Sequence, residues 1–194
     1  DLSNSDKTDG FIKGGARNLV KGDFSGKFLQ AGVAELTMAA ICNGIALHGG
    51  IHVACATFFV FSDYMKPAFR LSALMQMPVK YIWTHDAFRV GEDGPTHQPI
   101  EHEAQLRLLE KMQNHAGKMS MLALRPADAA ETSVAWKMAM ENTETPTALV
   151  LSRQNINDLP AATDRYTEAL KAEKGAYIVQ KNGENPKVIL IASG

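Results

Sequence analysis

The amino-acid sequence predicts an α/β domain in which a mostly parallel sheet is covered by helices on both faces. Short apolar segments rich in β-branched and aromatic residues alternate with longer segments in which apolar residues recur at helical spacing. Such strand-helix units build a parallel sheet through right-handed crossovers. In addition, the apolar segment Val79–Trp83 runs directly into a polar loop, Thr84–Glu101, as expected where ligands bind at the carboxyl edge of a sheet.

The composition indicates a chain with a substantial core and little net charge. Of 194 residues, 45% are hydrophobic, and 20 basic residues nearly balance 21 acidic ones. Because there is no basic run, nothing favours binding to nucleic acid or to an anionic membrane. No apolar stretch approaches the roughly 20 residues of a membrane helix, and no signal-peptide pattern is present. We therefore expect a soluble, cytoplasmic protein, with Cys42 and Cys55 as buried thiols rather than a disulfide.

The first half of the chain supplies two predicted helices and two predicted strands. Val33–Leu47 is a helix with an acid in its first turn, and a pair of glycines ends it. Ile51–Phe59 has the composition of a central strand. A second helix begins at Ser62, and the strand Val79–Trp83 follows it.

The second half continues the alternation. A helix is expected from about Ile100 to Gln113, followed by a surface excursion near Lys111–Lys118 and a buried strand at Met119–Pro126. The next helix begins with a capping pattern, in which Asp128 precedes Glu131 by three residues. A further strand is predicted at Thr147–Leu151.

The two ends of the chain differ in character from its middle. Residues 1–160 form the predicted main domain, including an extended, glycine-rich lead-in over 1–27. Residues 161–194 are interpreted as a linker and the start of a following domain, with a strand near Ala176–Gln180 and a buried strand at Val188–Ala192. Since the chain opens without an initiator Met and stops after an apolar segment, we expect a piece of a longer polypeptide.

The loop Thr84–Glu101 holds two histidines, His85 and His97, close to several carboxylates. A solvated surface loop is the simplest alternative, but loops that carry titratable groups in this density are more often functional. The spacing of these residues matches no closed tetrahedral metal site, so we assign no metal ligands to this chain.

Three further features have a structural and a functional interpretation. Glu35 stands among apolar residues, and a glutamate in a first helical turn is commonly only a favourable dipole partner. The aromatic run Phe58–Tyr64 is more often core than ligand platform. Arg153, after the strand at Thr147–Leu151, can hold a phosphate or carboxylate, or form a surface ion pair.

Four motifs in one order resemble the transketolases, thiamine-diphosphate enzymes that move two-carbon ketol units between sugar phosphates. GEDGPTHQP at Gly91–Pro99, preceded by THD, resembles the family signature. GVAELTMAAICNGIALHGG resembles the helix of the catalytic glutamate, TFFVFSDYMKPAFRLSALM the segment that stacks on the cofactor, and LSRQN the phosphate-binding strand end. The resemblance covers the middle, pyrimidine-binding domain of such an enzyme.

The resemblance implies how the cofactor would be held. Glu35 would hydrogen-bond the ring nitrogen of the aminopyrimidine and favour its imino tautomer, because a carboxylate in apolar surroundings has a raised proton affinity. Phe61 and Tyr64 would pack against the pyrimidine, with Phe58 behind them, and Asp1 matches an acid near the cofactor.

The same resemblance implies a substrate site. His97 and Asp93 match residues that orient and polarise the carbonyl and hydroxyl groups of the sugar, so His97 is a predicted catalytic residue beside Glu35. His85, Arg153 and Ser5 match groups that bind the phosphate of the substrate.

The resemblance also implies partners. Thiamine diphosphate and its magnesium or calcium ion would be held partly by an amino-terminal domain of a second subunit, in a homodimer that acts on sugar phosphates. That domain is not in this chain, so the chain alone is expected to be inactive. Ala34, Leu36 and Arg89 depart from the family pattern.

Alternatives remain open at this point. Dihydroxyacetone synthases and deoxyxylulose-phosphate synthases share this domain. The second is disfavoured because Gln-Pro-Ile-Glu follows the shared Gly-Pro-Thr-His. A non-catalytic protein, or one subunit of a split enzyme, is the third possibility.

Overall fold

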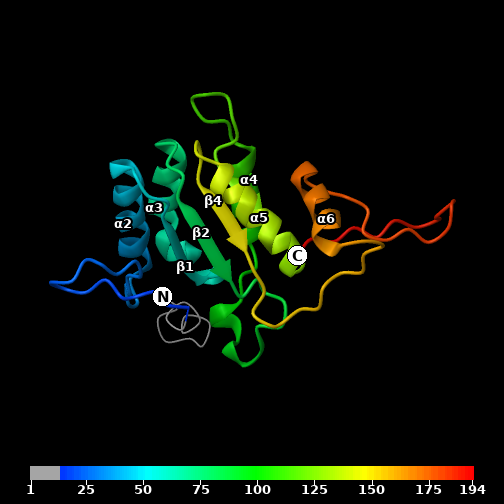
Figure 1. The fold of residues 1–194 in the computed structure, drawn as a ribbon, viewed down its shortest axis with the longest axis horizontal. Coiled ribbons are helices and arrows are strands. Elements are labelled where there is room, and N and C mark those ends of the chain that lie inside the picture. The colour runs from blue at the N-terminus through cyan, green and yellow to red at the C-terminus, as the bar shows by residue number, and fades with distance from the viewer. Residues whose placement is uncertain (1–13) are drawn as a thin grey trace.

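The computed structural model describes residues 14–194, which form a four-stranded parallel sheet with helices on both faces (Figure 1). The order of the strands is β1-β2-β4-β3, and every neighbouring pair is parallel. The fold class predicted from the sequence is therefore confirmed. The strands are β1 (Ala54–Phe58), β2 (Lys80–Thr84), β3 (Leu122–Leu124) and β4 (Thr147–Val150).

The helices fall where the apolar periodicity predicts them, with shifts of a few residues at their ends. The predicted helix at Val33–Leu47 is observed as α2, and the helix predicted from Ser62 is observed as α3. The helices are α2 (Glu35–His48), α3 (Ser62–Leu74), α4 (His102–Lys111), α5 (Ala129–Glu141) and α6 (Arg165–Ala169), with short 3-10 turns η1 (Phe59–Phe61), η2 (Gly91–Asp93), η3 (Pro95–His97) and η4 (Leu170–Lys174).

The main core lies between the sheet and the helices α2, α3 and α4. Tyr81 and Trp83 of the central strand β2 are almost completely buried in it. Helix residues such as Ala39, Met65 and Leu106 pack against the same face. Alternation along β2 sends its other side chains to the opposite face of the sheet.

That opposite face is covered by α5. Ala135 and Ala139 form a smaller core with Leu149 of β4, and Ile82 of β2 packs at its edge. The predicted cap of α5 is confirmed, because the Asp128 carboxylate accepts a hydrogen bond of 2.8 Å from the backbone N–H of Glu131.

The surface excursion predicted near Lys111–Lys118 is present between α4 and β3. The Asn114 side-chain oxygen accepts hydrogen bonds from the backbone N–H groups of Ala116 and Lys118, which closes the turn. The neighbouring residues Gln113 and Met119 form an antiparallel bridge.

The C-terminal segment differs from the prediction. Neither Ala176–Gln180 nor Val188–Ala192 is a strand, and Val188, Ile189, Leu190 and Ile191 are exposed. The physical reason is that a strand needs a hydrogen-bonding neighbour, and within residues 14–194 no strand pairs with either segment. The segment instead extends away from the body and returns to it (Figure 1).

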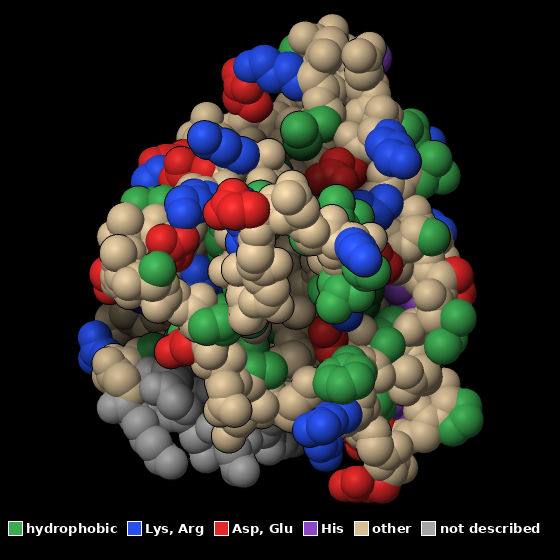
Figure 2. All heavy atoms as spheres, turned by 90° about the vertical axis from the view of Figure 1, so that its right-hand side faces the viewer, with side chains coloured by type: hydrophobic (Ala, Val, Ile, Leu, Met, Phe, Trp, Pro, Cys, Tyr) green, Lys and Arg blue, Asp and Glu red, His purple; other side chains and the backbone are tan. Residues whose placement is uncertain are grey.

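The surface that carries α6 and this C-terminal segment has no patch of a single charge. Figure 2 shows Lys and Arg side chains interspersed with Asp and Glu side chains over this face. Among residues 14–194, no helix is long and apolar enough to cross a membrane. Cys42 and Cys55 are buried free thiols, as predicted.

Candidate functional site

The carboxyl ends of the four parallel strands meet at one edge of the sheet, and the candidate site lies there. The turn η1 follows β1, the loop Thr84–Glu101 follows β2, and Arg153 follows β4. In Figure 1 the arrowheads of β2 and β4 point to this edge, at the lower side of the view. Residues far apart in the sequence are thereby brought together, as predicted from the ends of the strands.

Aromatic rings from β1, η1 and α3 form a continuous shelf. Phe58 stacks on Phe61 with ring centroids 5.9 Å apart, and Phe61 stacks on Tyr64 at the same separation of 5.9 Å. The Tyr64 side chain is 63% exposed, so the outer end of the shelf faces solvent. Part of the predicted aromatic platform is therefore accessible to a flat ligand.

The two predicted histidines lie against this shelf. The His85 ring stacks on Phe58 with centroids 3.7 Å apart, and the His97 ring meets Phe61 edge to face at 5.2 Å. Hydroxyl groups next in sequence contact both rings at Nδ1, from Thr84 and from Thr96, each at 2.9 Å. These contacts fix the plane of each imidazole while leaving the edge of the shelf open.

The loop between the histidines contributes carboxylates and is anchored by Arg153. Asp93 Oδ2 lies 4.0 Å from His85 Nε2 and 3.6 Å from Arg153 Nε. Arg153 Nη2 lies 3.6 Å from Glu92 as well. His85, Asp93 and Arg153 thus form one cluster, in which a guanidinium and an imidazole lie close enough to share an anionic ligand.

Glu35 is the first residue of α2 and is only 8% exposed. The end of α2 leads into the amino end of β1, so its beginning lies at the carboxyl edge of the sheet, as Figure 1 shows. A glutamate that is largely enclosed at this edge is suited to a ligand that brings a hydrogen-bond donor.

The backbone of the loop is strained at three residues in its first part. His85, Ala87 and Arg89 have φ values of 62°, 86° and 56°, in the left-handed region that residues with a Cβ rarely adopt. Gln98 donates a hydrogen bond of 2.8 Å from its side chain to the Ala87 carbonyl, which holds this conformation. Local strain of this kind is concentrated at functional sites.

A buried ion-pair network under the loop is a feature that the sequence did not reveal. Arg125 Nη2 lies 3.0 Å from Asp86 Oδ2, and Arg125 Nη1 lies 2.8 Å from Glu103. The Asp86 side chain is 7% exposed. These groups line a hollow of about 360 Å³ beside the loop, with exposed Phe88 and Ile100 at its rim. Arg125 lies near the end of the predicted strand Met119–Pro126, and Arg153 follows the predicted strand Thr147–Leu151. That position was the only sequence signal for Arg125.

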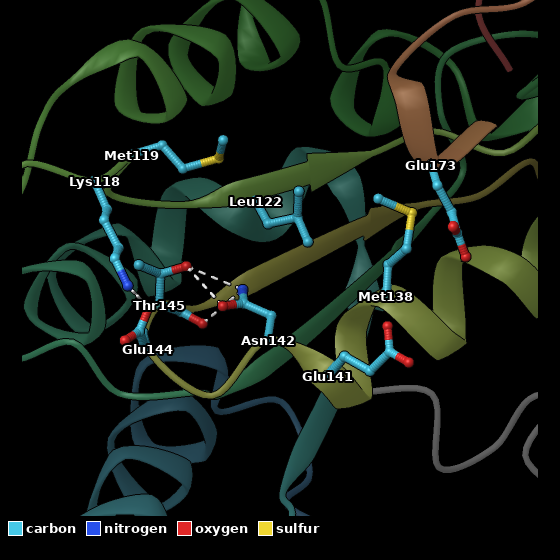
Figure 3. Close-up of a pocket in the computed structure, with 9 residues that line it drawn as sticks. All are labelled: Lys118, Met119, Leu122, Met138, Glu141, Asn142, Glu144, Thr145 and Glu173. Atoms are coloured by element: carbon cyan, nitrogen blue, oxygen red, sulfur yellow. Dashed lines mark hydrogen bonds and ion pairs between the residues drawn. The ribbon is translucent and has the colours of Figure 1, made fainter. Parts of the chain in front are cut away.

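A larger hollow of about 580 Å³ lies at the opposite, amino edge of the sheet (Figure 3). Its polar groups are already satisfied: Asn142 hydrogen-bonds Thr145, and Lys118 pairs with Glu144. None of the predicted site residues lines it. We therefore place the candidate site at the carboxyl edge.

Two predicted site residues, Asp1 and Ser5, lie outside the described residues. The structure gathers seven of the others into one cluster: Phe58, Phe61, Tyr64, His85, Asp93, His97 and Arg153. Glu35 lies at the same edge of the sheet, in the first turn of α2.

The fold and the cluster define an open α/β domain with a candidate ligand site at its carboxyl edge, in which an aromatic shelf adjoins imidazole, carboxylate and guanidinium groups. Comparison with known proteins gives the family. The family model of the transketolase pyrimidine-binding domain matches residues 2–158. The chain belongs to this family.

Transketolases that match this chain along its whole length are much longer than it is. It is 50% identical over 196 residues to the transketolase of Bacillus subtilis, covering 100% of this chain and 27% of that protein. A crystal structure of Pichia stipitis transketolase in complex with sedoheptulose 7-phosphate superposes with a TM-score of 0.79 at 38% identity, covering 95% of this chain and 26% of the other. A structure described as a split-gene transketolase, an inactive beta4 tetramer, gives a TM-score of 0.59 at 30% identity and covers 83% of this chain and 46% of the other. The chain thus spans about a quarter of the length of the curated relative.

Proposed function

We propose that this chain supplies the pyrimidine-binding side of a thiamine-diphosphate site in a transketolase, which transfers a two-carbon ketol unit between sugar phosphates. The observation that carries the proposal is the juxtaposition of the aromatic shelf with His85, His97 and Asp93 at the edge where Glu35 begins α2. Family membership makes this the reaction to test first.

The residues present fit the pyrimidine half of the cofactor. Phe61 and Tyr64 offer flat apolar faces, with Phe58 behind them, and such faces suit a planar heteroaromatic ring. The carboxylate of Glu35, a largely buried residue, would hold a ring nitrogen and share its proton. When bound, the cofactor supplies the carbanion-stabilising chemistry, and this chain supplies position and electrostatics. In the proposal Asp1 is an acid near the cofactor.

The substrate would lie between the histidines. His97, at the outer end of η3, would orient and polarise the carbonyl and hydroxyl groups of the sugar together with Asp93. His85 and Arg153, which both lie within 4.0 Å of Asp93, would hold the phosphate, and Ser5 is assigned to the same group.

The diphosphate and its magnesium or calcium ion would be held by an amino-terminal domain of a second subunit. Apolar side chains exposed on and just before α2 support such a partner: Val33 precedes the helix, and Leu36, Ile41 and Leu47 lie on it, all 39–86% exposed, while Ala39 and Cys42 are in the core. Exposed apolar surface can mark a protein interface. We propose a homodimer in which α2 lies at the contact.

Without that partner the chain would bind thiamine diphosphate weakly and would not catalyse transfer. A second candidate function is one subunit of a split enzyme, which the likeness to the split-gene structure favours. We also retain a boundary near residue 160, with 161–194 leading to a further domain. The end of the family match at residue 158 supports this boundary.

Calorimetric titration of the chain with thiamine diphosphate and magnesium tests the first point. We expect no micromolar binding by the chain alone, and micromolar binding once the amino-terminal domain is supplied as a separate chain or by fusion.

Glu35→Gln in that assembled enzyme tests the chemistry. We expect a loss of two-carbon transfer of at least about 100-fold, within the usual range for a positioned acid-base group. Glu141→Gln is the control, because that glutamate ends α5 on the other face of the sheet. Transfer at the wild-type rate by Glu35→Gln would contradict the assignment.

A further inference from the structure

We infer that His102 is a positioning residue that fixes the spacing between the two halves of the candidate site. This inference rests on the proposed function. His102 is the first residue of α4, directly after the loop Thr84–Glu101, and it is 5% exposed. Nothing in its sequence position distinguished it from an ordinary helix residue.

The Nε2 atom of His102 reaches across to the segment that carries the aromatic shelf. It lies 3.1 Å from the Val60 carbonyl oxygen and 3.1 Å from Asp63 Oδ2. Val60 is the middle residue of η1, and Asp63 is in the first turn of α3. The Val60 carbonyl is a hydrogen-bond acceptor, so Nε2 carries the hydrogen and donates to it, and the Asp63 carboxylate lies beside this bond.

The rest of the ring is enclosed. The ring packs edge to face on Phe59 at 5.7 Å, and Nδ1 lies 3.9 Å from Glu101 Oε2. Nδ1 is buried and has no hydrogen-bond partner among residues 14–194. The imidazole therefore has one orientation in which its N–H group makes a hydrogen bond. In that orientation Nε2 points at η1.

The same two segments also meet on the solvent side, where His97 contacts Phe61 at 5.2 Å. Only the residues from Gln98 to Glu101 separate His97 from His102. The segment His97–His102 and the turn η1 are thus in contact at two places. His102 contacts Val60 on the buried side, and His97 contacts Phe61 on the exposed side. Because a buried donor is costly to leave without its acceptor, the contact of His102 with Val60 sets the gap into which the cofactor ring must fit.

Replacement of His102 in the assembled enzyme tests this inference. Leu keeps the apolar volume but removes the donor, so we expect His102→Leu to raise the dissociation constant of thiamine diphosphate by about tenfold, the size of one lost hydrogen bond. The kcat at saturating cofactor should change less than the affinity. Gln retains an N–H donor at a similar reach, and we expect His102→Gln to restore binding to near the wild-type value.

Two controls separate positioning from general destabilisation. His115→Leu makes the same change on the exposed excursion at the far edge of the sheet, and it should leave cofactor binding unchanged. Asp63→Ala removes the carboxylate that lies 3.1 Å from His102 Nε2, so its effect should not add to that of His102→Leu in a double-mutant cycle.

The outcomes are distinguishable. Wild-type enzyme that binds no thiamine diphosphate defeats the proposed function, whereas wild-type binding that is unaltered in His102→Leu defeats only this inference. Failure of Gln to rescue, or additive effects with Asp63→Ala, also overturns it.

A metal ion is the rival explanation, because Asp63, Glu101 and His102 offer ligand atoms within 4.8 Å of one another. Stoichiometric Zn²⁺ binding by the wild-type chain that is lost in His102→Gln would establish the ion and overturn the hydrogen-bond role. Nitrogen NMR of the imidazole in the metal-free chain gives a readout independent of activity. We expect the Nε2–H tautomer, and an Nδ1–H tautomer would contradict the assignment.

Discussion

The imidazole of His85 lies almost flat on the ring of Phe58, with ring centroids 3.7 Å apart and planes 28° apart. Phe58 ends β1, His85 follows β2, and the register pairs Phe58 with Thr84 across the two strands. The stacking therefore follows from the hydrogen-bond ladder of the sheet, and it holds a histidine whose own backbone is left-handed.

Under the proposed function, loss of that stacking should weaken the binding of phosphorylated substrates. In the assembled enzyme, Phe58→Leu leaves His85 without its stacked partner, and we expect a several-fold rise in KM for sugar phosphates with kcat less affected, on the ~1 kcal/mol scale of aromatic pairs. Steady-state kinetics measure this. Phe24→Leu, at a ring that is 80% exposed, should leave KM unchanged.

Arg153 should distinguish phosphorylated from unphosphorylated substrates. Arg153→Lys keeps the charge but loses the planar fork, and Arg153→Met loses both. We expect KM for a sugar phosphate to rise in the order wild type, Lys, Met, while KM for an unphosphorylated ketose stays nearly constant. Equal effects on both substrates would indicate that the ion pairs with Glu92 and Asp93 are structural only.

The left-handed backbone at Ala87 predicts an unusual response to glycine. Glycine adopts this conformation without the Cβ penalty, so Ala87→Gly should leave stability unchanged or raise it by up to about 1 kcal/mol. Ala40→Gly, at an exposed position within α2, should lower it by about 1 kcal/mol. Urea unfolding of both variants measures the contrast. A loss at Ala87 equal to that at Ala40 would contradict the prediction.

The contact between α6 and α5 depends on a buried ion pair. Arg165 Nε lies 2.6 Å from Asp128 Oδ2, and Asp128 is completely buried. Arg165→Met leaves this carboxylate unpaired, and we expect a loss of about 3 kcal/mol in the free energy of unfolding. Lys137→Met, which breaks only exposed pairs with Glu141 and Glu173, should have a much smaller effect because solvent screens such pairs. Equal losses would contradict the role of burial.

Stability should fall in alkaline solution because of Tyr81. Burial raises the pKa of Tyr81 well above its usual range, and the hydrogen bond with Ser72 only partly opposes this. The folded chain keeps the phenol proton while the unfolded chain releases it above pH ~10, so stability is present below that pH and is lost as pH rises beyond it. Tyr81→Phe should flatten the decline between pH 9.5 and 11 by up to about 1.4 kcal/mol per pH unit.

Urea midpoints across this pH range measure the effect. Tyr166→Phe, at an exposed ring, is the control and should leave the slope unchanged. The Cys55 thiol acts in the same direction, since the neighbouring Cys42 thiol and burial raise its pKa. An unaltered slope in Tyr81→Phe would show that other groups govern the alkaline loss.

Much of the sheet and the position of the site could be predicted from the sequence. Apolar segments such as Val79–Trp83 identify buried strands, and in a parallel sheet the residues that follow such strands share one edge. The gathering of His85 and Arg153 at that edge follows from this rule.

The features that escaped prediction depend on partners that a single sequence does not identify. His102 reads as an ordinary helix residue until Val60 is placed 3.1 Å away, and Arg125 gains its role only from Asp86. The reverse holds for Val188–Ala192, whose composition favours a strand but which has no strand beside it within residues 14–194. Local composition predicts the type of element, and pairing decides whether it forms.

The parallel register of β1 and β2 has a consequence for how this domain can diverge. Phe58 and His85 meet because Phe58 pairs with Thr84 at the end of an unbroken ladder. Deleting one residue within either strand would turn the last side chain to the opposite side of the sheet, whereas the excursion near Asn114 can change in length without moving either ring. Homologous sequences should therefore differ in length at the excursion near Lys111–Lys118 and keep the lengths of β1 and β2.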